Sequence, residues 1–227
     1  HRPEFDPANV KYLSGIITSY DAFRFTHGYV EARARVPEGQ GLWPAFWTLN
    51  TQYTGIAPEI DVMEYLGDDP NVVYNTYHWF DTSGPQWEAR NTPSFRVVGP
   101  DYSSGFHTFG MAWEPGQIIW YVDGVETHRV ASPEVDVSNQ SMYLLANLAV
   151  GGYWPGSPDA TTPFPAEYEL DYIHAYEKKT SIPVDLDEYE LAFFDEFEGG
   201  ALDPAKWNTS FVWGPFLPIN RALQYYV

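Results

Sequence analysis

The stretch APEIDVMEYLG, residues 57–67, places three carboxylates close together: Glu59, Asp61 and Glu64. Side chains alternate between the two faces of a strand, so Glu59 and Asp61 share a face while Glu64 falls on the other. One extra residue at Val62 or Met63, a β-bulge, would return Glu64 to the face of the other two. The spacing therefore predicts a bulged strand that carries all three carboxylates in one row.

Two glutamates on either side of an aspartate can perform acid–base chemistry. They lie about 13 Å apart along a bulged strand at about 3.3 Å per residue. Side chains that lean inward could bring the two carboxyls to the roughly 5–5.5 Å that suits a nucleophile and a general acid in a retaining glycosidase. Crowding should also leave one proton on the row. Two other interpretations stay open: solvated acids on an exposed strand face, or a calcium site.

Aromatic residues surround these acids in the sequence. GLWPAFWTLN precedes them and YNTYHWF follows. Trp43 and Trp47 share a face by alternation, and indoles stack on the apolar faces of sugar rings. His78 is either a structural histidine or a contact to the acids or the sugar. This neighbourhood favours a sugar-binding cleft over solvated acids.

Three further residues are candidates for sugar binding. Trp154 lies in the loop GGYWPG, which suits the rim of a cleft. Asn147 and Asn220 carry amides that could bind sugar hydroxyls, unless turn or backbone groups satisfy them.

Composition excludes several classes of function. The 227 residues include 31 acidic and 12 basic side chains, for a formal net charge of -19, so partners such as nucleic acid or anionic membranes are not expected. The absence of cysteine excludes disulfides and thiolate chemistry. With no signal pattern and no apolar run of about 18 residues, we expect a soluble mature form. Secretion and a monomeric state are separate expectations.

Short β-rich runs separated by Gly, Pro, Asn and Asp fill the chain, and helical periodicity is missing apart from a turn at DPAKW. Evenly spaced strands without alternating helices predict an all-β sandwich or barrel. We expect one domain over residues 1–227, with hairpins at EPGQ and VDGV and a linker-like stretch at 178–187. The expected strands lie within residues 28–36, 59–66, 71–80, 107–130, 141–150, 168–177 and 189–197.

The motif Glu59-Ile60-Asp61-Val62-Met63-Glu64 resembles the E-[IL]-D-x-x-E signature of glycoside hydrolase family 16, with GLWPAFW before it and HWF, WYVDG and LLANLAVGGYWPG after it. The likeness is to laminarinase-type endo-β-1,3-glucanases and β-1,3(4)-glucanases. It implies a β-jelly-roll of two curved antiparallel sheets with an open concave cleft, and retaining hydrolysis of β-glucans without a cofactor. Glu59 would be the nucleophile, Glu64 the general acid and base, and Asp61 a hydrogen-bond partner of the nucleophile.

Two features depart from that resemblance or extend it. YELAFFDEFEGG, from residue 189, resembles the family's first strand but follows its last, so the chain is expected to be circularly permuted through residues 178–187. The family also implies a structural calcium ion, and its carboxylate ligands would correspond to Asp171 and Glu196. A non-catalytic carbohydrate-binding domain and a galactan hydrolase of the agarase or carrageenase type remain alternative functions.

Overall fold

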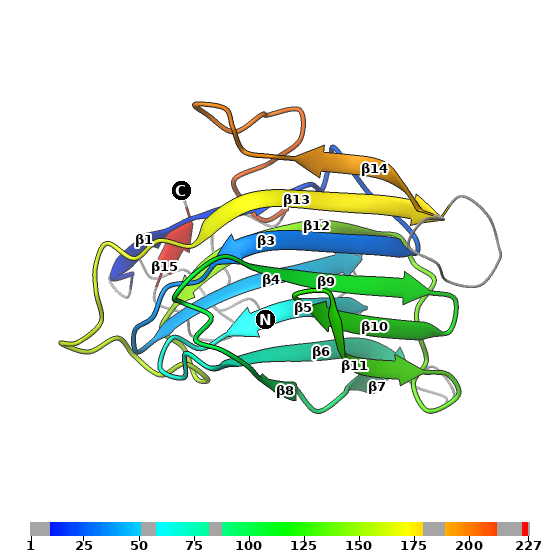
Figure 1. Ribbon diagram of the computed structural model, residues 1–227, viewed down its shortest axis with the longest axis horizontal. Helices are drawn as coiled ribbons and strands as arrows, with labels where there is room; N and C mark the ends of the chain where they lie inside the picture. The colour runs from blue at the N-terminus through cyan, green and yellow to red at the C-terminus, as the bar shows by residue number, and fades with distance from the viewer. Residues whose placement is uncertain (1–9, 51–57, 82–87, 179–188, 213–223, 227) are drawn as a thin grey trace.

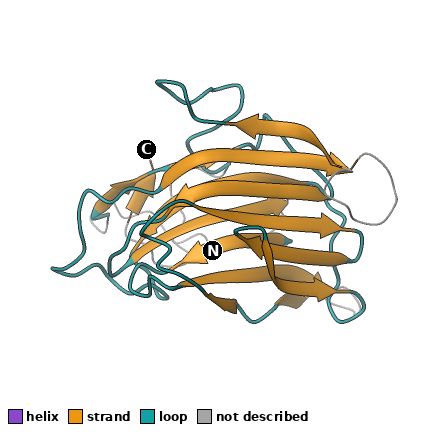
Figure 2. Ribbon diagram, in the orientation of Figure 1, coloured by secondary structure: helices purple, strands orange, loops and turns teal. Residues whose placement is uncertain are grey.

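The computed structural model describes residues 10–50, 58–81, 88–178, 189–212 and 224–226. Its described elements are strands, most of which form two antiparallel sheets that lie one over the other (Figures 1 and 2). This is the all-β jelly-roll that the sequence predicted. No helix among the described residues is long and apolar enough to cross a membrane.

The first sheet has six strands in the order β11-β10-β9-β3-β13-β14. The tight turns predicted at EPGQ and VDGV join β9, β10 and β11. At the second turn, Asp123 and Gly124 both have positive φ angles, 49° and 75°, as a two-residue hairpin turn of this hand requires. The strand bounds are β3 Gly28–Arg35, β9 His107–Glu114, β10 Gln117–Val122, β11 Val125–Ala131, β13 Glu169–Lys178 and β14 Tyr189–Asp195.

The second sheet runs β2-β12-β4-β5-β6-β7, and β8 also pairs with β6. A separate parallel pair joins β1 to β15, which brings the two ends of the described chain together (Figure 1). The strand bounds are β1 Tyr12–Ser14, β2 Ile16–Thr18, β4 Leu42–Asn50, β5 Glu59–Tyr65, β6 Val72–Asp81, β7 Glu88–Asn91, β8 Phe95–Val98, β12 Met142–Val150 and β15 Gln224–Tyr226.

Apolar side chains from both sheets fill the space between them. Val30 and Ala32 of β3 meet Phe46 of β4 and Ile60 of β5 in one buried cluster. Because alternate residues of each strand are used for this core, the intervening residues face outward. The outer face of the seven-stranded sheet therefore receives every second residue of β4 and β6.

β13 pairs with β14, the next strand along the chain, and the circular permutation remains a prediction. Ile173 pairs with Asp195 and Lys178 with Tyr189 in an antiparallel ladder, so the strand that resembles the family's first lies beside the one that resembles its last. Apart from Lys178, the predicted joining segment 178–187 lies outside the described residues. The turn predicted at DPAKW is present, with the Lys206 and Trp207 amides donating to the Asp203 carbonyl.

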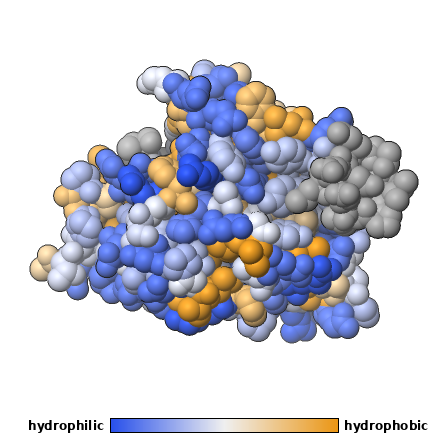
Figure 3. All heavy atoms as spheres, viewed as in Figure 1, coloured by the Kyte–Doolittle hydropathy of each residue, from blue (hydrophilic) through white to orange (hydrophobic). Residues whose placement is uncertain are grey.

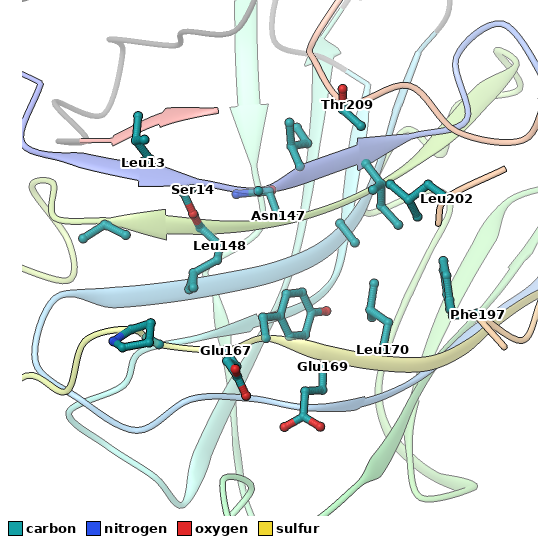
Figure 4. A pocket seen from close by; sticks show the side chains of 18 of the residues that line it. Leu13, Ser14, Asn147, Leu148, Glu167, Glu169, Leu170, Phe197, Leu202 and Thr209 are labelled. Carbon is teal, nitrogen blue, oxygen red and sulfur yellow. The ribbon is translucent and has the colours of Figure 1, made fainter. Parts of the chain in front are cut away.

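A cavity of about 770 Å³ opens at the side of the sandwich, between β1, β2 and β12 on one side and β13 on the other (Figure 4). Leu13, Leu148, Leu170 and Leu202 are among its lining residues. Glu59, Asp61 and Glu64 do not line this cavity, so it is not the site at which those acids could act. Figure 3 shows one face of the molecule, which is mainly hydrophilic with smaller apolar areas.

Candidate active site

A β-bulge in β5 brings the three acids onto one face, as their spacing predicted. Against β4, Asp61 pairs with Trp47 and Met63 with Phe46, so Val62 is the extra residue. Against β6, the register likewise shifts between Asp61 and Glu64. Val62 and Met63 consequently both enter the core, and Glu64 returns to the outer face that holds Glu59 and Asp61. We call Glu59, Asp61 and Glu64 the acid row.

Two tryptophans stand beside the acid row on β4. Trp43 and Trp47 are the two half-buried positions of that strand and lie on one face, as alternation predicted. Trp47 is directly opposite Asp61, and Ala45, between the two indoles, is opposite Glu64. Because the Ala45 side chain is small, the space beside Glu64 is open to the indoles of Trp43 and Trp47.

The Trp43 indole is hydrogen-bonded to the Glu64 carboxyl. Its Nε1 donates a hydrogen bond of 3.1 Å to Glu64 Oε1. Burial first, and then the negative charge of Asp61, raise the pKa of Glu64 well above its ordinary value, while hydrogen bonds from Trp43 and Thr76 act in the opposite direction. A carboxyl that keeps its proton toward neutral pH can act as a general acid.

Glu59, Asp61 and His78 form a compact group at the other end of the row. His78 Nε2 lies 3.1 Å from Asp61 Oδ2 and 3.8 Å from Glu59 Oε1. Burial, the charges of Asp61 and Glu64, and a hydrogen bond with Asp61 raise the pKa of Glu59 well above its ordinary value. Burial alone would lower the pKa of His78, but the hydrogen bond and charge of Asp61 outweigh it and raise that pKa. A protonated His78 would offset part of the negative charge of the row.

The same three residues are the described group best placed to hold a metal ion. One ligand atom from each of Glu59, Asp61 and His78 lies within 4.8 Å of the others. Asp61 is only 6% exposed at its side chain, and its carboxylate already accepts from His78. An ion here would compete with the protonated imidazole for the same oxygen.

Trp154 extends the aromatic surface past Glu64. Its ring meets Trp43 edge-on at 5.4 Å and Tyr74 at 4.9 Å between centroids, and the residue is 39% exposed. The loop that carries it is fixed by hydrogen bonds from Gly151 N to Gly41 O and from Gln40 Nε2 to Pro155 O. The rim position predicted for Trp154 thus lies next to the general-acid candidate.

Asn147 supports the site through another side chain. Its Oδ1 accepts from Trp47 Nε1 at 2.8 Å, and its Nδ2 donates to the Tyr226 hydroxyl at 2.9 Å. Because Asn147 is buried and engaged on both sides, it orients the Trp47 indole. The direct sugar contact expected of its amide remains a prediction, and Asn220 lies outside the described residues.

The two carboxylates predicted to hold calcium have partners within the protein. Asp171 is hydrogen-bonded to Arg33, and Glu196 Oε1 lies 2.7 Å from His174 Nε2. Like charges on paired strands repel each other unless a cation lies between them. Arg33 supplies a permanent positive charge to Asp171, and His174 supplies a hydrogen-bonding nitrogen to Glu196, so the calcium prediction gains no support here.

Residues on β6 were missed by the sequence interpretation. Tyr74 pairs with Glu64 and Thr76 with Asp61, so both lie on the face of the acid row together with His78. Period-two alternation back from His78 would have identified them. Tyr226, whose hydroxyl accepts a hydrogen bond from Asn147, could not be identified by alternation because it lies 79 residues further along the chain.

Comparison with known proteins agrees with this geometry. Residues 8–174 match the model of glycosyl hydrolases family 16. A curated relative, the endo-1,3-1,4-β-glycanase ExsH of Rhizobium meliloti, is 41% identical over 165 residues, which make up 73% of this chain and 33% of that protein. The chain thus spans about a third of the length of this relative.

Solved structures of glucanases are also similar to this chain. The endo-β-1,3-glucanase from Pyrococcus furiosus is 41% identical with a TM-score of 0.59, over 69% of this chain and 63% of that one. The laminarinase catalytic domain from Thermotoga maritima is 36% identical with a TM-score of 0.63, over 72% and 68% of the two chains. The family model covers most of the chain, including the acid row and both tryptophans of β4. The chain therefore belongs to glycosyl hydrolases family 16.

Proposed function

We propose that this protein is a retaining endo-β-glucanase that cleaves internal bonds of β-1,3- or mixed β-1,3-1,4-glucans. The observation that carries the proposal is the bulge in β5, which puts Glu59 and Glu64 on one face with Asp61 between them and indoles beside them. Relatives named as endo-1,3-1,4-β-glycanase and endo-β-1,3-glucanase support the choice of substrate.

The reaction proceeds in two displacements. A Glu59 carboxylate oxygen attacks the anomeric carbon, while Glu64 gives its proton to the departing glycosidic oxygen, so that one glucan fragment leaves and the other is esterified to Glu59. Glu64, now ionised, takes a proton from water, and the resulting hydroxide attacks the same carbon and releases Glu59. Two inversions at one carbon give net retention.

Asp61 and His78 set the charge of the nucleophile. When protonated, the His78 imidazole, 3.1 Å from Asp61 and 3.8 Å from Glu59, places a positive charge beside both carboxyls and opposes the burial that raises the Glu59 pKa. The hydrogen bond with Asp61 acts in the other direction, because it also raises the Glu59 pKa. When Glu59 becomes an ester its charge disappears, and the Asp61–His78 pair remains balanced.

The aromatic surface binds the chain around the scissile bond. Trp43 and Trp154 lie on the Glu64 side and Trp47 lies opposite Asp61, so successive sugars can stack along the outer face of the seven-stranded sheet. A binding surface that extends to both sides of the acid row suits internal cleavage of a long polymer.

Activity on a panel of polysaccharides tests the proposal. Laminarin and lichenan should lose viscosity quickly and yield mixed oligosaccharides, whereas carrageenan should be left intact because the formal charge of -19 disfavours a sulfated substrate. Agarose is neutral, so its hydrolysis in preference to the glucans would support the galactan hydrolase instead. Glu59→Gln and Glu64→Gln should each abolish turnover of laminarin without loss of fold, and azide should restore activity of Glu64→Gln on an activated substrate. Hydrolysis within about tenfold of wild type in either variant, about 1.4 kcal/mol of barrier, would refute the assignment.

A structural calcium ion is a separate proposal that rests on family resemblance alone. Asp171 and Glu196 would have to exchange Arg33 and His174 for the ion. If the ion binds the native state, an excess of chelator should lower the melting temperature and leave the pH profile of activity unchanged. An unchanged melting curve, with no metal found by elemental analysis, would dismiss it.

A further inference from the structure

A band of aromatic rings crosses the outer face of the six-stranded sheet, on the opposite side of the sandwich from the acid row. Ring centroids follow one another at 6.5, 5.9, 6.1 and 6.0 Å. The band spans four inter-strand steps, about 19 Å at about 4.8 Å each. Its members, in order from β14 through β13 and β3 to β10, are Phe194, His174, Tyr176, Tyr29 and Tyr121. We call this set the outer aromatic band.

The rings of the outer aromatic band face away from the core. Their strand neighbours Val30, Ile173, Ala175 and Phe193 pack in the core cluster, so the alternate positions point outward. At one end of the band Phe194 is 46% exposed, and Leu191, opposite Tyr176 on β14, is 47% exposed. Exposed apolar side chains grouped on one surface commonly mark a binding site.

Tyr29 lies across the neighbouring strand β9. A Cβ atom at Gly110 would come within 2.4 Å of the Tyr29 hydroxyl oxygen, so the glycine makes room for the ring against the sheet. A ring held in this way is preorganised, because it loses little further freedom when a ligand stacks on it. Gly110 is otherwise in a regular strand, where glycine contributes least to stability.

Hydrogen-bonding groups lie at the edge of the rings. Glu31 accepts a hydrogen bond of 2.7 Å from the hydroxyl of Tyr29 and another of 2.7 Å from that of Tyr172. The Tyr172 ring stacks on His174 at 4.2 Å, beside the band. Apolar ring faces bordered by carboxylate and phenol oxygens match a sugar, which has apolar C–H faces and a rim of hydroxyls.

The charge around the band selects among polymers. Glu31 and Glu196 border the band, and Lys206 Nζ lies 5.0 Å from the centroid of the Phe194 ring, so the local charge is mixed. The formal net charge of -19 disfavours a sulfated polysaccharide, an acidic peptide or nucleic acid. A neutral polymer has no such penalty. We propose that the outer aromatic band is a second binding surface for a neutral β-glucan chain, remote from the acid row. The identity of the polymer rests on the proposed function.

The experiment measures polymer binding in protein that carries Glu59→Gln, so that the ligand is not consumed. Retardation in gels containing soluble laminarin or lichenan gives the affinity, with a saturating short oligosaccharide present to occupy the acid row. Phe194→Ala and Leu191→Ala remove exposed members of the surface. Phe95→Ala is the matched control, because Phe95 is 39% exposed on β8 and stacks on His128 outside the band.

We expect Phe194→Ala to weaken polymer binding about three- to tenfold, the effect of losing one stacked ring, and Leu191→Ala to weaken it less. Phe95→Ala should bind as the parent does, and melting curves should show that all three variants are folded. Equal binding by Phe194→Ala and the parent, or an equal loss in Phe95→Ala, would overturn the proposal. Failure of the protein with Glu59 intact to hydrolyse laminarin or lichenan would instead refute the proposed function, and the comparison of binding between the variants could still be made.

Discussion

Replacing Trp43 by Phe should move the pH dependence of catalysis in a defined direction. The change keeps a stacking ring but removes the Nε1 donor that lies 3.1 Å from Glu64 Oε1. A hydrogen bond to a carboxylate favours the charged form, so its loss lets Glu64 hold its proton to a higher pH. The alkaline limb of kcat/KM, which reports loss of the general acid's proton, should therefore move upward.

The size of this change follows from the type of bond. A hydrogen bond to a charged group contributes about 1.5–3 kcal/mol, and about 1.4 kcal/mol corresponds to one pH unit. Water can replace part of what the indole supplied, so the lower end applies and the limb should rise by about one pH unit.

The assay is kcat/KM for laminarin from about pH 4 to pH 10, with Trp47→Phe as the matched control. Trp47 lies on the same strand and face but donates to Asn147 rather than to an acid, so its loss should reduce affinity without moving the alkaline limb. An alkaline limb that stays in place or moves down in Trp43→Phe would refute the role given to this hydrogen bond. An equal shift in Trp47→Phe would do the same.

The remaining predictions concern stability and substrate affinity. Glu64→Gln should raise the melting temperature at pH 7–8 and lose that advantage near pH 4. Burial raises the Glu64 pKa, so ionisation of this carboxyl above its unfolded pKa of about 4.3 destabilises the fold. A larger gain in melting temperature at pH 4 than at pH 8 would contradict this. Asn147→Ala should lower the free energy of unfolding by about 1–3 kcal/mol in urea titrations, because the Trp47 donor loses its acceptor. It should also raise KM more than it lowers kcat. An unchanged KM would exclude the role of Asn147 in positioning Trp47.

Local patterns in the sequence were enough to predict the acid row. The period of two along a strand requires a bulge before Glu64 can join Glu59 and Asp61, and the described register has that bulge. The same rule placed Trp43 and Trp47 on one face. It applies because one strand sets both the spacing and the direction of these side chains.

Contacts between distant segments could not be predicted in this way. Trp47 and Asn147 are 100 residues apart, and Arg33 and Asp171 are 138 residues apart, so the spacing of residues within one strand could not predict either contact. The first pair gives Asn147 a supporting role that local spacing did not indicate, while its predicted sugar contact remains a prediction. The second gave Asp171 a guanidinium where a calcium ion had been predicted. Pairing between β12 and β4, and between β13 and β3, determines these contacts.

The configuration of the first product tests the central claim most directly. Proton NMR during the first minutes of laminarin or lichenan hydrolysis separates the two anomers of the new reducing end before they interconvert. The proposed double displacement through Glu59 predicts that the β-anomer appears first and that the α-anomer grows only by mutarotation. First appearance of the α-anomer would show that water attacks directly, and it would contradict the role assigned to Glu59 as nucleophile.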